Sequence, residues 1–265
     1  MGEADNTNEQ ARARSSAARH SSLLKRASTL AEHGKFDEAI ANVKQAMAIC
    51  PRDPKSSLRL ADIYRAQNRI GPAIEAMQRA VELDPLNSTA HEQLLRSLLE
   101  LGRYDEAIST SNMVIQSSPK SIFARDILGI VYLQQGRIDN ALRVTNELIR
   151  IDPTDSAHYF KKGVLLQQKG EIAQAMSLFS RVIDMDPEGE MAEDAREAIA
   201  ALDSYQLRQV LTIAVEDAVF KTKLTLDPES ALAERGYRLS TGGLIALRQI
   251  DLDEIPSESQ IRYYH

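Results

Sequence analysis

The residue types that most often carry chemistry are few in this chain and stand far apart. Neither the single cysteine, Cys50, nor the histidines show the spacing of a zinc site. The histidines are His20, His33, His91, His158 and His265. One cysteine cannot form a disulfide within a chain, and Cys50 is expected to be a small buried apolar residue. The sequence therefore predicts no metal site and no disulfide framework.

No motif for phosphate binding or for an activated nucleophile is found. G-x-S-x-G, the P-loop and G-x-G-x-x-G are all missing. Gly242 and Gly243 lack the downstream Lys-Ser of a phosphate loop, so the pair indicates a turn at a helix start. Asp251, Asp253 and Glu254 form an acidic corner that is expected to be solvated. We therefore expect a protein that is not an enzyme and has no cofactor.

The overall composition limits the kinds of partner that this chain is expected to bind. Of 265 residues, 43% are hydrophobic and 26% charged, as is usual for a folded soluble chain. The net charge of −6 argues against nucleic acid, which selects basic domains. No apolar run reaches the roughly 18 residues of a membrane span, and the first residues lack the apolar core of a secretory signal. We expect a cytoplasmic protein that binds neither nucleic acid nor membrane.

One seven-residue phrase recurs along the chain at a fixed spacing. It is written GKFDEAI at 34–40, NRIGPAI at 68–74, GRYDEAI at 102–108, GRIDNAL at 136–142 and GEIAQAM at 170–176. The copies begin 34 residues apart, without insertions. A constant period in this range indicates stacked supersecondary units.

Each position of the repeat has a physical role when the units are set as 20–53, 54–87, 88–121, 122–155 and 156–189. Small residues at the eighth and twentieth positions let two helices approach closely. A Gly or Asn between the helices accepts a left-handed backbone, and Pro at the thirty-second position ends the second helix. The invariant positions are Ala39, Ala73, Ala107, Ala141 and Ala175, and Pro51, Pro85, Pro119, Pro153 and Pro187.

With this small–aromatic–small–proline pattern, residues 20–189 resemble the tetratricopeptide repeat family. The usual Trp at the fourth position is absent, and Leu95 replaces a small residue at the eighth. The resemblance implies an all-α, right-handed superhelical solenoid whose first helices line a concave groove. Residues 1–19 are polar and are expected to be a disordered tail.

Two helical segments are expected after the repeats. Residues 190–202 are predicted to form a capping helix with Met191, Ala195, Ile199 and Leu202 on its apolar stripe. Residues 203–265 are predicted to form a C-terminal helical extension. Its first helix is expected to begin at an N-cap, Asp203 or Ser204, and to bury Leu207, Val210, Leu211, Ala214, Ala218 and Val219.

Two further helices of the extension are marked by their ends. One is expected to be capped by Asp227, to begin at Pro228 and to end at Gly236. The next is expected to begin at Ser240, and residues 256–265 are expected to be frayed. The extension either continues the solenoid or folds back into the groove.

The resemblance places a partner-binding groove on the first helices by repeat position. The groove residues that follow are Lys55, Arg59, Arg65, Arg96, Phe123, Ile127, Ile130, Leu133, Phe160 and Val164. The groove is thus expected to be charged in the second and third repeats and apolar in the fourth and fifth. The Lys and Asn clamp by which some members hold a chaperone carboxylate is missing, because Leu24, Ser28, Leu58 and Asp62 occupy those positions.

The sequence thus predicts a non-enzymatic scaffold or adaptor. Its partner is expected to be another protein or a peptide, of which an amphipathic helix is one form. Two alternatives stay open: an accessory or regulatory subunit that contacts an enzyme through the extension, and a self-assembling homo-oligomer.

Overall fold

The computed structural model describes the backbone of residues 2–252 and the side chains of residues 14–252. The regular elements of that range are the helices α1 to α14, so the all-α prediction is confirmed. The chain divides into two compact units, Met1–Val131 and Tyr132–His265, which are described in turn. The end expected to be frayed, 256–265, lies outside the described residues.

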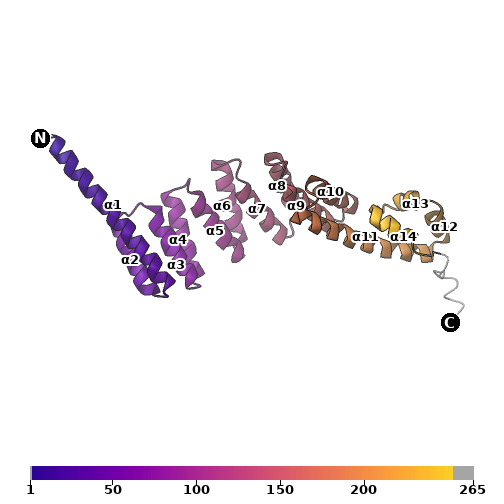
Figure 1. Cartoon of the computed structure of the whole chain (residues 1–265), viewed down its shortest axis with the longest axis horizontal. Coiled ribbons are helices and arrows are strands. Elements are labelled where there is room, and N and C mark those ends of the chain that lie inside the picture. Colours follow the sequence, from indigo (N-terminus) through magenta and orange to yellow (C-terminus); the bar gives the residue numbers. More distant parts are fainter. Residues whose placement is uncertain (1, 253–265) are drawn as a thin grey trace. The chain divides into compact units, whose positions relative to one another are not determined.

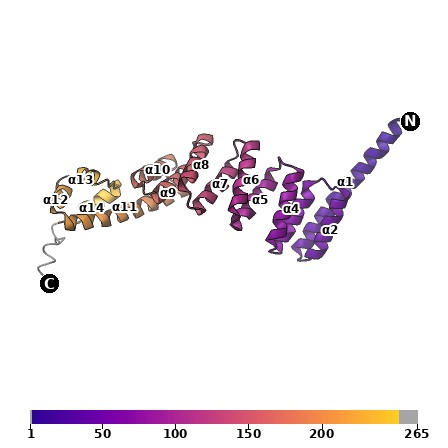
Figure 2. The ribbon, with the colours of Figure 1, turned by 180° about the vertical axis from the view of Figure 1, so that it is seen from behind.

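The first unit is a row of helix pairs (Figure 2). Its helices are α1 (Gly2–Glu32), α2 (Phe36–Ile49), α3 (Pro54–Ala66), α4 (Ile70–Leu83), α5 (Ser88–Glu100), α6 (Tyr104–Ser117) and the first part of α7 (Ile122–Gln134). Within pairs, α1 packs on α2, α3 on α4 and α5 on α6. Neighbouring pairs join through α2 with α3 and α4 with α5.

The second unit continues the same pattern and then departs from it. Its helices are α8 (Ile138–Ile151), α9 (Ser156–Gln168), α10 (Ile172–Met185), α11 (Glu190–Glu216), α12 (Ala218–Leu226), α13 (Pro228–Glu234) and α14 (Thr241–Arg248). The helices α8 to α11 pack in succession, and α12 and α14 pack on the long helix α11 (Figure 1).

The turn inside each pair is made as the sequence predicts. Gly34, Gly102, Gly136 and Gly170 have φ between 67° and 86°, and Asn68 has φ 56°. The chain then closes the first helix in the same way each time: the Gly34 amide donates to the Ala31 carbonyl at 2.9 Å. These bonds satisfy the carbonyl groups that a helix end leaves open.

The small residues of the repeat lie where helices cross. The eighth-position and twentieth-position alanines of the described repeats are fully buried, and they are Ala27, Ala39, Ala61, Ala73, Ala107, Ala141 and Ala175. At Gly163 a Cβ would come within 2.6 Å of the Phe179 ring. Close helix contact therefore depends on these positions, as predicted.

In two repeats a hydrogen bond from the fourth position stands in place of the missing Trp. The His91 Nε2 lies 3.0 Å from the Pro85 carbonyl, and the Tyr159 hydroxyl donates to the Pro153 carbonyl at 3.1 Å. Both bonds run from the fourth position to the preceding repeat's invariant proline. Each ties the start of a first helix to the end of the helix before it.

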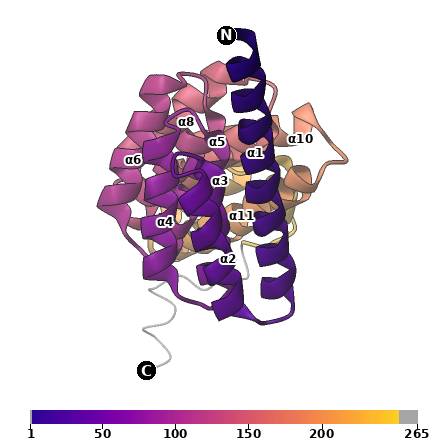
Figure 3. The same cartoon turned by 90° about the vertical axis from the view of Figure 1, so that its left-hand side faces the viewer.

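The N-terminal segment differs from the prediction. Residues 2–19, expected to be disordered, belong to α1, which spans Gly2–Glu32. No Gly or Pro interrupts residues 3–33, and Ala and Arg, two of the best helix formers, dominate residues 11–19. In Figures 1 and 3 this part of α1 continues past the end of its partner α2.

The boundary expected at 202–203 is also wrong, because α11 is one helix from Glu190 to Glu216. Asp203 is not its N-cap but a buried residue in its middle. The helix breaks at Asp217 instead, so Val219 and Ala218 are exposed rather than buried. Phe220 takes their place in the apolar core of the extension.

Helix α13 begins and ends as predicted, and α14 begins as predicted. The Asp227 carboxylate accepts from the Ser230 amide at the start of α13, and Gly236 ends that helix with φ 77°. The Ser240 hydroxyl accepts from the Gly243 amide at the start of α14. Helices α12 and α14 pack on α11.

Candidate partner-binding face

In the first unit, charged side chains of the predicted groove lie on α3, the first helix of the second repeat. Lys55 and Arg65 are exposed, while Arg59 and Asp62 are half-buried with 3.6 Å between the Arg59 Nη1 and the Asp62 Oδ2. Burial raises the pKa of Asp62 from its ordinary value of 3.8, and the charges of Arg59 and Arg65 oppose that rise. The carboxylate and the arginines therefore form one coupled cluster.

Farther along the same unit, α5 and α7 combine a charge with apolar surface. The Arg96 guanidinium lies over the Phe123 ring, 5.1 Å from its centroid, which is a cation–π contact. Phe123 packs partly on the core, and Ile127 is buried in that core with 5% of its surface exposed. Ile130 keeps 39% exposed. Arg96, Phe123 and Ile130 are thus the groove residues that offer contact area here.

In the second unit the corresponding apolar residues mostly serve the core. Phe160 lies 5.4 Å, centroid to centroid, from the buried Phe179 ring, and Val164 packs on the same cluster. Leu133 is half-buried. The apolar groove residues of the prediction therefore share their surface with intramolecular packing. The assignment of a groove to the ten residues stays a prediction.

A constellation that the sequence analysis missed joins α1 to the start of α3. The His20 Nε2 lies 2.8 Å from the Ser56 Oγ, and the His20 Nδ1 lies 3.6 Å from the Asp53 Oδ2. This order resembles a hydrolase triad. Ser56, however, is only 1% exposed, so a substrate cannot reach its hydroxyl. The three side chains instead link two repeats, a role that their separation in sequence conceals.

The structure gives no support for a metal site, a reactive cysteine or a membrane span among the residues that it describes. Residues 14–252 contain no group of three or more His, Cys, Asp and Glu arranged to hold a metal ion. Cys50 is half-buried, and its thiol is free. Within the described helices, none is long and apolar enough to cross a membrane.

The extension is held to α11 by polar contacts that the sequence did not predict. The buried Asp203 carboxylate accepts from the Ser240 amide at 2.8 Å and from the Ser240 hydroxyl. One turn later, Gln206 donates to the Arg238 carbonyl at 2.8 Å and accepts from the Arg238 amide at 3.0 Å. Two side chains of α11 thus bind the backbone that leads into α14.

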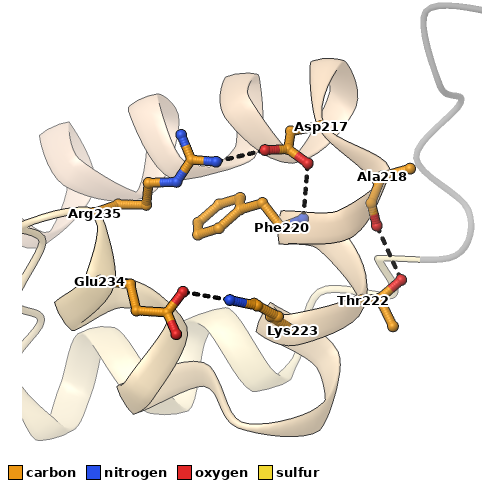
Figure 4. Close-up of polar contacts among 7 residues, drawn as sticks. All are labelled: Asp217, Ala218, Phe220, Thr222, Lys223, Glu234 and Arg235. Carbon is orange, nitrogen blue, oxygen red and sulfur yellow. Dashed lines mark hydrogen bonds and ion pairs between the residues drawn. The ribbon is translucent and has the colours of Figure 1, made fainter.

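Ion pairs hold α12 and α13 together (Figure 4). Arg235 pairs with Asp217 at 2.5 Å, and its guanidinium lies 5.2 Å from the centroid of the Phe220 ring. Lys223 pairs with Glu234 at 2.6 Å. The backbone amide of Phe220, more than Arg235, holds the pKa of Asp217 below its ordinary value of 3.8.

Helices α3 to α10 alternate between 13 and 14 residues, and each repeat has the same turn and a buried Ala at its twentieth position. These features define an α-helical repeat protein of the solenoid class. The family model described as "Tetratricopeptide repeat" matches residues 128–190, and that of "Anaphase-promoting complex, cyclosome, subunit 3" matches residues 32–114. The chain therefore contains tetratricopeptide repeats. Such repeats generally mediate contacts between proteins.

Known proteins similar to this chain carry the same repeats. The "Small glutamine-rich tetratricopeptide repeat-containing protein 2" of Mycosarcoma maydis is 36% identical over 76 residues. That match covers 29% of this chain and 22% of the relative.

Solved structures share the fold at lower identity. A crystal structure of MamA protein is 22% identical with a TM-score of 0.55, over 65% of this chain and 94% of that one. MamA from Desulfovibrio magneticus RS-1 is 16% identical with a TM-score of 0.54, over 65% and 97%. YrrB, described as "a TPR protein with an unusual peptide-binding site", is 18% identical with a TM-score of 0.52, over 66% and 90%.

Proposed function

We propose that this chain is a non-enzymatic adaptor that binds a segment of another protein on the face formed by its first helices. The cytoplasm, expected from the sequence, is the proposed location. The observation that carries the proposal is the pair of exposed residues Arg96 and Ile130 on α5 and α7, with the half-buried Phe123 ring under the Arg96 guanidinium. Both helices contribute to one buried core cluster, and YrrB, which shares the fold, is described as having a peptide-binding site.

The chemistry of this face favours a partner segment with both apolar and acidic side chains. Apolar contact with Ile130 and the open part of Phe123 would bury surface at about 25 cal/mol per Å². The arginines at 59, 65 and 96 would orient acidic groups, which adds specificity more than affinity. An amphipathic helix with an acidic edge meets both needs.

The proposal is tested by measuring how strongly variants of this chain, with altered charge and size on this face, capture partner proteins. Ile130→Asp with Arg96→Glu is expected to weaken capture at least about tenfold, or about 1.4 kcal/mol, because both side chains contact the partner directly. Lys44→Glu with Arg79→Glu, exposed residues on the second helices α2 and α4, is the matched control. Circular dichroism checks that each variant is folded. Equal capture by both variants would contradict the proposal.

The extension supports a second candidate, contact with an enzyme as an accessory subunit. Val219 and Leu226 on α12 are 69% and 80% exposed, and Ile245 on α14 is also exposed. Val219→Ser with Leu226→Ser would then remove the partner, while the change at Ile130 and Arg96 would leave it bound. The two candidates therefore give opposite results in the same capture experiment.

A further inference from the structure

The N-terminal part of α1 is rich in basic residues. Residues 14–19 are all exposed, and α1 has 31 residues against the 14 of its partner α2 (Figure 3). No acidic residue occurs from Gln10 to Ala31, in a chain whose net charge is −6. The basic residues of that stretch are Arg12, Arg14, Arg19, Lys25 and Arg26.

Two of these arginines follow one line along the helix. Arg19 and Arg26 stand seven residues apart, which places them on one stripe with about 10.5 Å between them. The side chains of Arg19 and Arg26 are exposed, and neither pairs with any residue whose side chain the structure describes. We call Arg19 and Arg26 the arginine stripe.

A helix in this position gains from a partner. In proteins, most of the stability of a helix comes from the packing of one of its faces. Residues 14–19 of α1 have no such packing. A surface that carries the opposite charge at the same spacing would both hold the helix and neutralise the stripe.

The chain itself carries such a surface at the start of α11. Glu190, Glu193, Asp194 and Glu197 are spaced i, i+3, i+4 and i+7, so they share one face, and all four are exposed. The ends of this face, 190 and 197, also stand seven residues apart. Only Glu193 has an ion pair among the described residues, with Arg196 at 3.0 Å. We call these four residues the acidic face.

We propose that the arginine stripe of one copy docks along the acidic face of a second copy. Paired guanidinium and carboxylate groups at equal spacing align two helices in one register. The contact is heterologous, because each copy offers α1 and accepts at α11. It is separate from the partner-binding face on α5 and α7. A second copy is favoured over nucleic acid or an anionic membrane, because the negative net charge of this chain repels both.

Sedimentation velocity of the full chain over a range of concentrations tests the proposal. Association is expected at about 50 mM salt and is expected to weaken at least about tenfold at about 500 mM, because exposed charges are screened. Arg19→Glu with Arg26→Glu is expected to be monomeric, and so is Glu190→Lys with Glu197→Lys. An equimolar mixture of these two variants is expected to associate again, because each then offers the charge that the other lacks.

The control is the pair Lys44→Glu with Arg79→Glu, which changes the net charge as much as the stripe variant and is expected to associate like the wild type. A wild type that is monomeric at every concentration and salt would overturn the proposal, as would a mixture that fails to associate. Binding of wild type to RNA or to phosphatidylserine vesicles, lost in the stripe variant while the chain stays monomeric, would assign the stripe to a polyanion instead.

Discussion

Gly163 decides how closely α9 and α10 can pack. The nearest atoms to a Cβ added there belong to the ring of Phe179, which is fully buried and cannot move aside freely. The same eighth position holds Ala27 and Ala61 in other repeats, both fully buried. In another repeat this position holds Leu95, which is also fully buried, so the room at a crossing depends on the facing side chain, and Phe179 fills it at Gly163.

Gly163→Ala is expected to lower the free energy of unfolding by about 1–3 kcal/mol, because it overpacks the crossing. Urea titration followed by circular dichroism measures the change. The control is Gly71→Ala on α4, where an added Cβ has no neighbour within 4 Å and Ala is the better helix former. An equal loss in both variants would point to backbone effects instead of overpacking.

At the scale of elements, α12 depends on its N-cap. The Asp217 carboxylate accepts from the Phe220 amide at 2.9 Å, and this bond is the main reason that its pKa is lowered. A carboxyl with a depressed folded pKa stabilises the structure above its unfolded pKa. That stabilisation is lost as the pH falls through the folded pKa.

Amide exchange should therefore detect α12 opening in acid. Protection of the Phe220 and Leu224 amides is expected to fall as the pH drops below about 4, the ordinary aspartate range. In Asp217→Ala the protection is expected to be low at neutral pH too, with no further loss in acid. A mutant that keeps the acid-dependent loss would assign it to another group.

The contact of α11 with the extension depends on Asp203. Asp203→Ala leaves the Ser240 amide without its acceptor in a half-buried site, which costs about 1–3 kcal/mol. Limited proteolysis is expected to cut the mutant faster between α13 and α14 than the wild type. Asp194→Ala, an exposed change on the same helix, is the control and should be cut at the wild-type rate.

The sequence predicts those elements whose signals are local. Alanines and prolines at fixed repeat positions, glycines in the turns and the caps at Asp227 and Ser240 were all located correctly. The prediction for Asp203 was wrong because an Asp followed by polar residues is typical of an N-cap. Its actual partner, Ser240, lies 37 residues away in the sequence. The link from His20 to Ser56 was missed for the same reason. The groove was listed by position alone, which does not reveal that Ile127 is buried.

At the scale of the whole molecule, each repeat touches chiefly its neighbours, so stability is nearly a sum over units and interfaces. Ala107→Leu overpacks α6 against its pair and is expected to cost about 1–3 kcal/mol there. Hydrogen exchange of the whole chain should show faster exchange in α5 and α6 and unchanged exchange in α12 to α14. Uniform acceleration would mean that the chain unfolds as one cooperative body.

Asp203 and Gln206 recognise main-chain atoms of residues 238 and 240, and of the side chains in that loop they engage only the Ser240 hydroxyl. These contacts recognise the backbone conformation of residues 238–240 more than the identity of their side chains. Mutations at Arg238 can therefore accumulate without detaching the extension. Asp203 and Gln206 would also bind a grafted loop with the same backbone conformation. A different C-terminal segment could therefore be joined to α11 at this loop.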